Sequence, residues 1–265
     1  MLTLTKAHAY GNDFLYLPAE QALGRDEARL AVRLCDRHRG VGGDGLILYT
    51  PTSDGARMRL INADGSPAEL SGNGLRALAA MIVRGRPGGD QRDVLIDTDA
   101  GPRRLTLVAR EGARLTFRAH MGSPVGLREE TLQAGGESIR ASVFSIGNPQ
   151  CVLLGPLPDD DRFARVGAAL EGHPAFPQRT NVEFVSIESP SRVRIRIWER
   201  GVGPTESSGT GACASAIAAI AHGGAARSVE VIAPGGAQQV DWTDDGVFLT
   251  GWAEVVWEGT WVADL

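Results

Sequence analysis

Residues 62–74 read NADGSPAELSGNG, and residues 199–211 read ERGVGPTESSGTG. In both stretches a polar residue is followed, after eight residues, by Ser-Gly-x-Gly and then by an apolar run. The two stretches lie 137 positions apart. A serine before glycines and a helical apolar run is typical of a turn that leads into a helix. The chain therefore carries one loop-into-helix pattern twice.

Further matches extend this repeat. Gly11 and Asn12 recur as Gly147 and Asn148, while the turn at Asp44 falls 137 positions before Asn181. Solenoid repeats have periods of about 20 to 50 residues, so a period this long indicates two similar halves. We expect an N-terminal domain over residues 1–122, to which the tail 257–265 returns, and a C-terminal domain over residues 123–256.

The predicted elements are many short strands and four helices. Helical spacing of apolar residues predicts helices over 26–36, 75–83, 160–170 and 212–222. Alternating or β-branched segments predict strands over 57–62, 94–97, 104–108, 115–120, 142–146, 182–187, 193–198, 229–232 and 246–256. Strands that do not alternate strictly with helices favour the α+β class. We expect each half to hold a mainly antiparallel sheet and two helices.

Composition excludes several classes of function. The 265 residues are 43% hydrophobic and 22% charged, with a net charge of −5 and scattered Lys and Arg, which argues against a nucleic-acid partner. The N-terminus lacks the apolar core of a signal peptide, and no apolar run reaches a membrane span of about 18 residues. Three widely spaced cysteines argue against disulfides and against a zinc site. We expect a cytoplasmic protein without a membrane or metal partner.

The two glycine turns have the chemistry of an anion site. Glycines let backbone N–H groups approach a ligand, and a helix N-terminus adds partial positive charge, which suits a carboxylate or phosphate. Ser71 and Ser208 also fit helix N-caps, for which serine is favoured. Because both turns have a polar residue nine positions before the serine, ligand binding is the favoured interpretation.

Two other patterns invite functional interpretations. Gly40, Gly42 and Gly45 match G-x-G-x-x-G, but they follow a helical segment and precede an apolar run, the reverse of the order in a dinucleotide site. We therefore expect no nucleotide cofactor. Cys213 lies one and a half helical turns beyond Ser208 and is expected to be buried. Strand alternation turns Cys151 away from the pocket if Gln150 faces into it.

The sequence resembles the diaminopimelate epimerases, which invert an amino-acid α-carbon without pyridoxal phosphate. The segments that carry the resemblance are residues 6–14, 40–48, 62–74, 147–149, 179–184 and 198–213. They span almost the whole chain. The resemblance implies two pseudo-symmetric halves, a substrate held in the cleft between them, no cofactor and a homodimer.

The resemblance also implies the substrate-binding residues. Side chains of Asn12, Asn62, Asn148, Asn181, Glu199 and Arg200 are implied, with backbone contacts from Gly72, Asn73, Gly209 and Thr210. These residue types suit a zwitterion independently of any family. Arg200 can pair with a carboxylate, Glu199 with an ammonium group, and the asparagines can donate and accept between them. A surface ion pair of Glu199 and Arg200 is the alternative.

Three positions depart from the family pattern. Ser71 and Ser208 stand where the family has two proton-transferring cysteines, and Gln150 stands where it has a histidine. A thiol has a pKa near 8.5, whereas a serine hydroxyl is a weak base unless a neighbouring group activates it. We assign Ser71, Ser208 and Glu199 as the catalytic residues, with Glu199 able to assist Ser208. Two-base epimerisation is expected to be impaired.

Three explanations for the serines remain open. The first is a natural relative with slow or altered isomerase chemistry at the α-carbon of LL-diaminopimelate, a precursor of lysine and peptidoglycan, or of a similar amino acid. The second is an engineered double Cys-to-Ser change that traps a substrate, although it leaves Gln150 unexplained. The third is an amino-acid-binding protein or a one-base enzyme such as a dehydratase.

Overall fold

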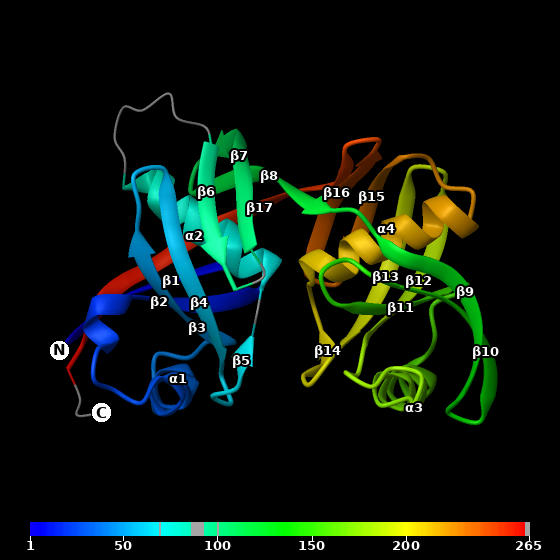
Figure 1. Cartoon of the computed structure of the whole chain (residues 1–265), viewed down its shortest axis with the longest axis horizontal. Helices are drawn as coiled ribbons and strands as arrows, with labels where there is room; N and C mark the ends of the chain where they lie inside the picture. Colours follow the sequence, from blue (N-terminus) through cyan, green and yellow to red (C-terminus); the bar gives the residue numbers. More distant parts are fainter. Residues whose placement is uncertain (69, 86–92, 100, 263–265) are drawn as a thin grey trace. The chain divides into compact units, whose positions relative to one another are not determined.

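The chain divides into two compact units. The computed structural model describes residues 1–68, 70–85, 93–99 and 101–262. Unit 1 comprises Met1–Ala119 and Gly251–Leu265, and unit 2 comprises His120–Thr250. Two long strands, β8 (Arg114–Gly122) and β17 (Gly246–Trp261), contribute residues to both units (Figure 1).

Unit 1 combines a sheet with two α-helices and one short 3-10 helix in its described part. Its elements are β1 (Leu2–Ala9), β2 (Asn12–Pro18), η1 (Ala19–Ala22), α1 (Glu27–Cys35), β3 (Gly45–Pro51), β4 (Gly55–Asn62), β5 (Pro67–Ala68), α2 (Gly72–Arg84), β6 (Asp93–Thr98) and β7 (Gly101–Glu111). Strand β1 also pairs with the C-terminal part of β17.

From β10 onward, unit 2 follows the order of strands and α-helices of unit 1. It contains β9 (Val125–Ala134), β10 (Glu137–Ser145), β11 (Pro149–Leu154), α3 (Asp160–Glu171), β12 (Asn181–Ser189), β13 (Arg192–Glu199), β14 (Gly203–Thr205), α4 (Gly209–His222), β15 (Ser228–Ala233) and β16 (Gly236–Thr243).

The strand pairings show that the two units are copies of one fold. In unit 1, β1–β2 is antiparallel, β2–β3 parallel, β3–β4 antiparallel, β4–β6 parallel and β6–β7 antiparallel. In unit 2, β10–β11, β11–β12, β12–β13, β13–β15 and β15–β16 follow the same sequence of directions. Each sheet is therefore mainly antiparallel, and the prediction of an α+β fold with two pseudo-symmetric halves is confirmed.

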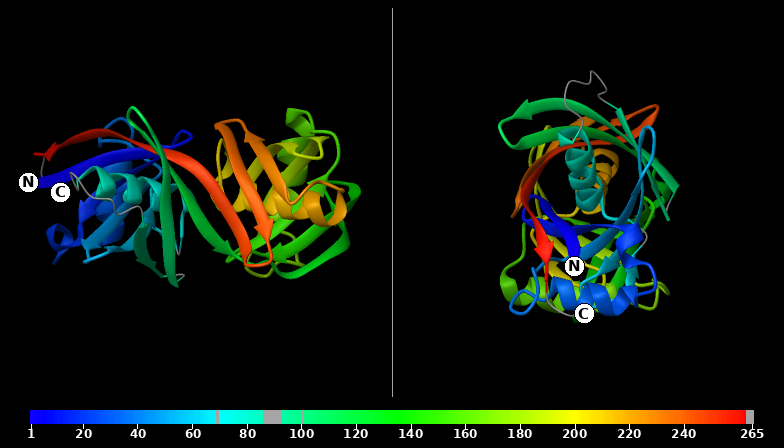
Figure 2. Two further views of the ribbon diagram at one scale, coloured as in Figure 1. Left: turned by 90° about the horizontal axis from the view of Figure 1, so that it is seen from above. Right: turned by 90° about the vertical axis from the view of Figure 1, so that its left-hand side faces the viewer.

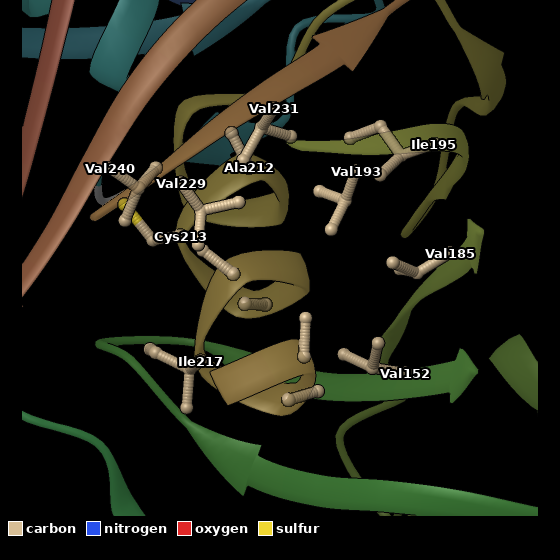
Figure 3. Close-up of a cluster of buried hydrophobic side chains, with 14 of the residues drawn as sticks. Val152, Val185, Val193, Ile195, Ala212, Cys213, Ile217, Val229, Val231 and Val240 are labelled. Atoms are coloured by element: carbon tan, nitrogen blue, oxygen red, sulfur yellow. The ribbon is translucent and has the colours of Figure 1, made fainter. Parts of the chain in front are cut away.

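Helices α2 and α4 lie inside their units. Helix α2 lies against β1, β2 and β6 (Figure 2), and α4 lies against β11, β12, β13, β15 and β16. Figure 3 shows Ala212, Cys213 and Ile217 of α4 among valine and isoleucine side chains of the surrounding strands. A helix that is apolar on nearly every side is stable only when it is buried in this way. Both helices begin directly after the serines of the repeated turns.

Helices α1 and α3 are amphipathic and pack on the outside of the sheets. Helix α1 lies against β3 and β4, and α3 lies against β12 and β13. Each begins with an aspartate N-cap, Asp26 in α1 and Asp159 in α3. All four predicted helices are present, and the cores of the nine predicted strands are strands in the structure. No helix in the described ranges is long and apolar enough to cross a membrane.

Candidate active site

The glycine turn of unit 1 places amide groups at the start of α2. Ser71 is the N-cap, and its Oγ accepts a hydrogen bond of 3.1 Å from the Gly74 N–H. A methyl group at Gly74 would lie 2.8 Å from Ile47 Cδ1, so the turn packs closely on β3. The Tyr16 hydroxyl donates to the Gly74 carbonyl at 2.8 Å. The turn is thereby held in place by its own cap and by two neighbouring strands.

Two predicted binding residues of unit 1 contact each other. Asn73 Nδ2 donates to Asn12 Oδ1 at 3.1 Å, and Asn12 Nδ2 donates to Asp44 Oδ2 at 2.7 Å. Asn73 Oδ1 accepts from the guanidinium of Arg76, which is only 1% exposed. Because both ends of this chain of hydrogen bonds are anchored, the two asparagine side chains have defined orientations.

An ion-pair cluster supports the Asn12 end of that chain. Asp13 pairs with Lys6 at 2.9 Å and with Arg37 at 2.7 Å, and Arg37 also reaches Asp44 at 2.8 Å. Burial alone raises the pKa of Asp13, but hydrogen bonds with Arg37 and Lys6 outweigh it and hold that pKa below its usual range. The cluster fixes the start of β2, where Asn12 lies.

Asn62 is the last residue of β4, and the backbone of the next residue is hydrogen-bonded to Asp44. The Ala63 N–H donates to the Asp44 carbonyl at 3.1 Å, and Asn62 Nδ2 donates to Ser66 Oγ at 3.0 Å. The structure therefore brings Asn12, Asn62 and Asn73 around Asp44 within unit 1. We call Ser71 and these three asparagines the N-terminal half-site.

The glycine turn of unit 2 has the same construction. Ser208 caps α4, and its Oγ accepts from the Gly211 N–H at 3.1 Å. Asn148 Nδ2 approaches Thr210 Oγ1 at 3.4 Å. This contact corresponds in sequence to the Asn12–Asn73 contact of unit 1. Both serines are therefore N-caps by geometry, and their acid–base roles remain predictions.

Asn181 and Arg200 lie together at the ends of β12 and β13. Asn181 Oδ1 accepts from the Arg200 N–H at 2.9 Å. The Arg200 guanidinium donates to the Gln178 carbonyl at 3.2 Å. Glu199 is the last residue of β13 and pairs with Gly203 across the β13–β14 hairpin. We call Ser208, Thr210, Asn148, Asn181, Glu199 and Arg200 the C-terminal half-site.

A buried glutamate, Glu171, holds the turn that carries Glu199 and Arg200. Its carboxylate accepts from the Trp198 indole at 2.8 Å and from the Gly201 N–H at 2.7 Å, and it pairs with Arg179 at 2.9 Å. Arg179 has a positive φ of 60°, a conformation that costs free energy in a non-glycine residue and that this ion pair helps to offset.

A second buried glutamate, Glu183, was not predicted from the sequence. It is 0% exposed and lies on β12, two residues after Asn181 and therefore on the same face of the strand. Burial, and then repulsion from Glu199, raise the pKa of Glu183 well above its usual range. The spacing from Asn181 was the signal that could have identified it.

The three cysteines do not replace the missing thiols. Cys35, Cys151 and Cys213 are all buried. Burial raises the pKa of Cys35 to about 12, and burial followed by repulsion from Glu183 raises the pKa of Cys151. A thiol with such a pKa is not a base near neutral pH. Cys213 packs in the α4 core and Cys151 on the opposite, α3-facing side of its sheet, as the sequence predicted.

Comparison with known proteins defines the family. The family model for diaminopimelate epimerase matches residues 4–126 and 142–256. The chain belongs to the diaminopimelate epimerase family. It is 43% identical, over 98% of its own length and 99% of the relative, to a diaminopimelate epimerase of Desulforudis audaxviator (strain MP104C). It is 38% identical, over 99% of each chain, to that of Desulfitobacterium hafniense (strain DSM 10664 / DCB-2).

Solved structures of other epimerases and racemases share the fold of this diaminopimelate epimerase family member. A predicted epimerase from Pseudomonas aeruginosa matches with a TM-score of 0.78 and 16% identity over 100% of both chains. A probable proline racemase from Agrobacterium radiobacter K84 matches with a TM-score of 0.73 and 18% identity, over 100% of this chain and 94% of that one. Family membership, together with these neighbours, supports an epimerase-like isomerase function acting on an amino acid.

Proposed function

We propose that this protein is a cofactor-independent isomerase that acts at the α-carbon of LL-diaminopimelate or of an amino acid of similar length. The observation that carries the proposal is the presence in each unit of a serine-capped glycine turn, at Ser71 and at Ser208, in a chain 43% identical to a diaminopimelate epimerase. Both half-sites are proposed to act on the same substrate molecule.

Binding is assigned to groups that complement a zwitterion. The backbone N–H groups of Gly72, Asn73, Gly209 and Thr210 lie at the N-termini of α2 and α4, where helix dipoles favour a carboxylate. Arg200 is assigned to a substrate carboxylate and Glu199 to an ammonium group. Asn12, Asn62, Asn148 and Asn181 supply further donors and acceptors to the substrate.

Catalysis is assigned to Ser208, Ser71 and Glu199. Glu199 accepts the Ser208 proton as Ser208 removes the α-proton, and Ser71 delivers a proton to the opposite face of the carbanion. Solvent then takes the proton from Glu199 and returns one to Ser71, which restores the enzyme. One proton leaves the α-carbon and one returns, so the amino acid is inverted without a net change in composition. Since serine is a weaker base than cysteine near neutral pH, turnover is expected to be slow.

The test is incubation with LL-diaminopimelate in D₂O. Loss of the α-proton signal in ¹H NMR, together with formation of the meso isomer on chiral chromatography, is the expected result. Binding of the amino acid without any deuterium incorporation, measured at substrate concentrations well above the dissociation constant, would rule out the proposed reaction and leave an amino-acid-binding protein.

A one-base reaction is the second candidate. It is favoured by Gln150, which stands at the position where the family has a histidine and which has no side-chain group that accepts a proton near neutral pH. Such an enzyme would exchange the α-proton with solvent while retaining configuration, or would eliminate a group from the β-carbon. In the D₂O experiment it gives deuterium incorporation without the meso isomer.

We also propose that the protein acts in the cytoplasm as a homodimer without a cofactor or metal. Light scattering coupled to size-exclusion chromatography tests the assembly, with a mass of twice 28.1 kDa expected. Unchanged exchange activity after dialysis against a chelator tests the absence of a metal requirement.

A further inference from the structure

Two neighbouring strands of unit 2, β11 and β12, place polar side chains on one face. In the parallel β11–β12 pair, Gln150 lies opposite Asn181, and Glu183 follows two residues along β12. Val152 and Val185, further along the same face, pack against α4 (Figure 3). Because side chains alternate between faces of a strand, Gln150 and Glu183 point toward the N-terminal end of α4.

Gln150 and Glu183 contact each other in complete burial. Both side chains are 0% exposed. With Gln150 Nε2 donating to Asn148 Oδ1, the Gln150 amide oxygen lies 3.0 Å from Glu183 Oε1 and 3.2 Å from Oε2, so a hydrogen bond between the two side chains requires a proton on Glu183. The other end of the Gln150 amide lies 2.6 Å from the side-chain amide of Asn148. Gln150 therefore connects Glu183 to a predicted substrate-binding residue.

Glu183 also abuts the glycine turn that carries Ser208. A methyl group at Gly211 would lie 3.0 Å from Glu183 Oε1 and 3.2 Å from Ser208 Oγ. The carboxyl group and the serine hydroxyl thus approach Gly211 from two sides. Gly211 is required here because any side chain would displace one of these two groups.

The surroundings of Glu183 offer no compensating positive charge among the described residues that face it. The titratable groups that interact with it are Glu199 on β13, whose carboxylate repels it, and Cys151 on β11. The arginines of β13 alternate with the core-facing Ile195 and Ile197, so they lie on the other face of the sheet, where they pair with other carboxylates. Helix α4 presents no charged side chain between Gly209 and Ala221. When two carboxyl groups interact in a low-dielectric region, one of them keeps a proton.

We propose that Glu183 is a positioning residue of the C-terminal half-site. As a neutral acid bonded to Gln150, Glu183 supports the Ser208–Gly211 turn. Because Glu183 carries no charge, Glu199 is the sole negative charge of that half-site. Gln150 suits this arrangement because a neutral amide requires no charged partner, whereas a histidine could ionise Glu183 by forming an imidazolium–carboxylate pair. The assignment of Glu199 as a base rests on the proposed function, while the protonation of Glu183 does not.

The protonation of Glu183 is tested by ¹³C NMR of protein labelled at the glutamate side-chain carboxyl carbons. The wild type is expected to show one resonance that titrates at much higher pH than the others. Glu183→Gln removes that resonance, and Glu188→Gln, an exposed position on the same strand, leaves it in place. Gln150→His is expected to move its titration to lower pH. A Glu183 resonance that titrates together with exposed glutamates overturns the proposal.

The functional part is tested by α-proton exchange as a function of pH. In the wild type, ionisation of Glu183 beside Glu199 is expected to reduce the rate of α-proton exchange at alkaline pH. In the Glu183→Gln variant, this decrease at alkaline pH is expected to disappear. A uniform loss of exchange at every pH would indicate a structural role and contradict the proposal. The Glu183 resonance could titrate at high pH in a protein that exchanges no α-proton. That result would overturn the proposed reaction but support the assignment of Glu183 as a neutral acid.

Discussion

Asn73, in the first turn of α2, donates a 3.1 Å hydrogen bond to Asn12, which lies 61 residues earlier at the start of β2. In unit 2, Thr210 and Asn148 make the corresponding contact over 62 residues. Each glycine turn is thus tied to an asparagine at the beginning of a neighbouring strand, at β2 in unit 1 and directly before β11 in unit 2. The sequence repeat therefore corresponds to a repeated local geometry.

Replacing Arg76 by methionine is expected to weaken substrate binding. Arg76 is buried and holds Asn73 Oδ1, so its loss frees Asn73 and, through it, Asn12. Removing one charge-assisted hydrogen bond corresponds to roughly a tenfold higher KM in the exchange assay. Arg84→Met, at an exposed position near the end of the same helix, is the control and is expected to leave KM unchanged.

Replacing either Ser71 or Ser208 by alanine is expected to reduce both stability and exchange. Loss of an N-cap costs about 1 kcal/mol of unfolding free energy, measured by urea denaturation. Loss of the acid–base hydroxyl is expected to lower exchange by about 10² to 10⁴-fold. Asp26→Ala removes the N-cap of α1 and separates the two effects. If all three variants lose stability but retain exchange, the serines are caps alone.

Replacing Gly167 by alanine is expected to destabilise unit 2 and to disturb the Glu199–Arg200 turn. The added methyl group would lie 2.8 Å from the ring of Trp198, whose indole is held by Glu171. Overpacking of this kind costs about 1 to 3 kcal/mol of unfolding free energy. Gly172→Ala, where the nearest atom is 3.9 Å away, is expected to be tolerated. Equal stability of the two variants would show that Trp198 moves freely.

The stability contribution of Asp13 is expected to disappear in acid. Its folded-state pKa is lower than its unfolded-state pKa, so the stabilisation is present above the unfolded value and is lost as pH falls through the folded value. The difference in unfolding free energy between wild type and Asp13→Asn is therefore expected to hold from pH 7 to about pH 5 and to shrink as pH falls from about 4 to about 2. A difference that stays constant over this range would contradict the ion-pair cluster with Lys6 and Arg37.

Helices and alternating strands were readily predicted from the sequence, whereas several interior strands were not. Residues 12–18 and 45–48 are buried almost continuously, so they lack the alternation that marks a strand with one exposed face. The exposed, charged strand over residues 125–134 lacks an apolar face for most of its length. Hydrophobic periodicity identifies elements that face water on one side only. These segments are buried on both faces or largely exposed on both faces, so they lack that pattern.

The residues assigned to the two half-sites were named from the sequence and stay a prediction, whereas the contacts that support them were not predicted. Ser71, Ser208 and the asparagines were identified from the repeat and the family resemblance. The support from Asp44, Arg76 and Glu171 depends on contacts between residues 3 to 32 positions apart, which sequence spacing does not determine. Glu183 was overlooked, although its spacing of two residues from Asn181 places it on the same face of β12 as that predicted binding residue.

Restoring the residues of the family pattern tests the central claim most directly. The triple variant Ser71→Cys, Ser208→Cys and Gln150→His is expected to exchange the α-proton of LL-diaminopimelate with D₂O faster than the wild type, because thiols are accessible bases near neutral pH. A folded triple variant that binds the amino acid yet exchanges no faster than the wild type would contradict the claim that the two glycine turns hold a shared substrate α-carbon.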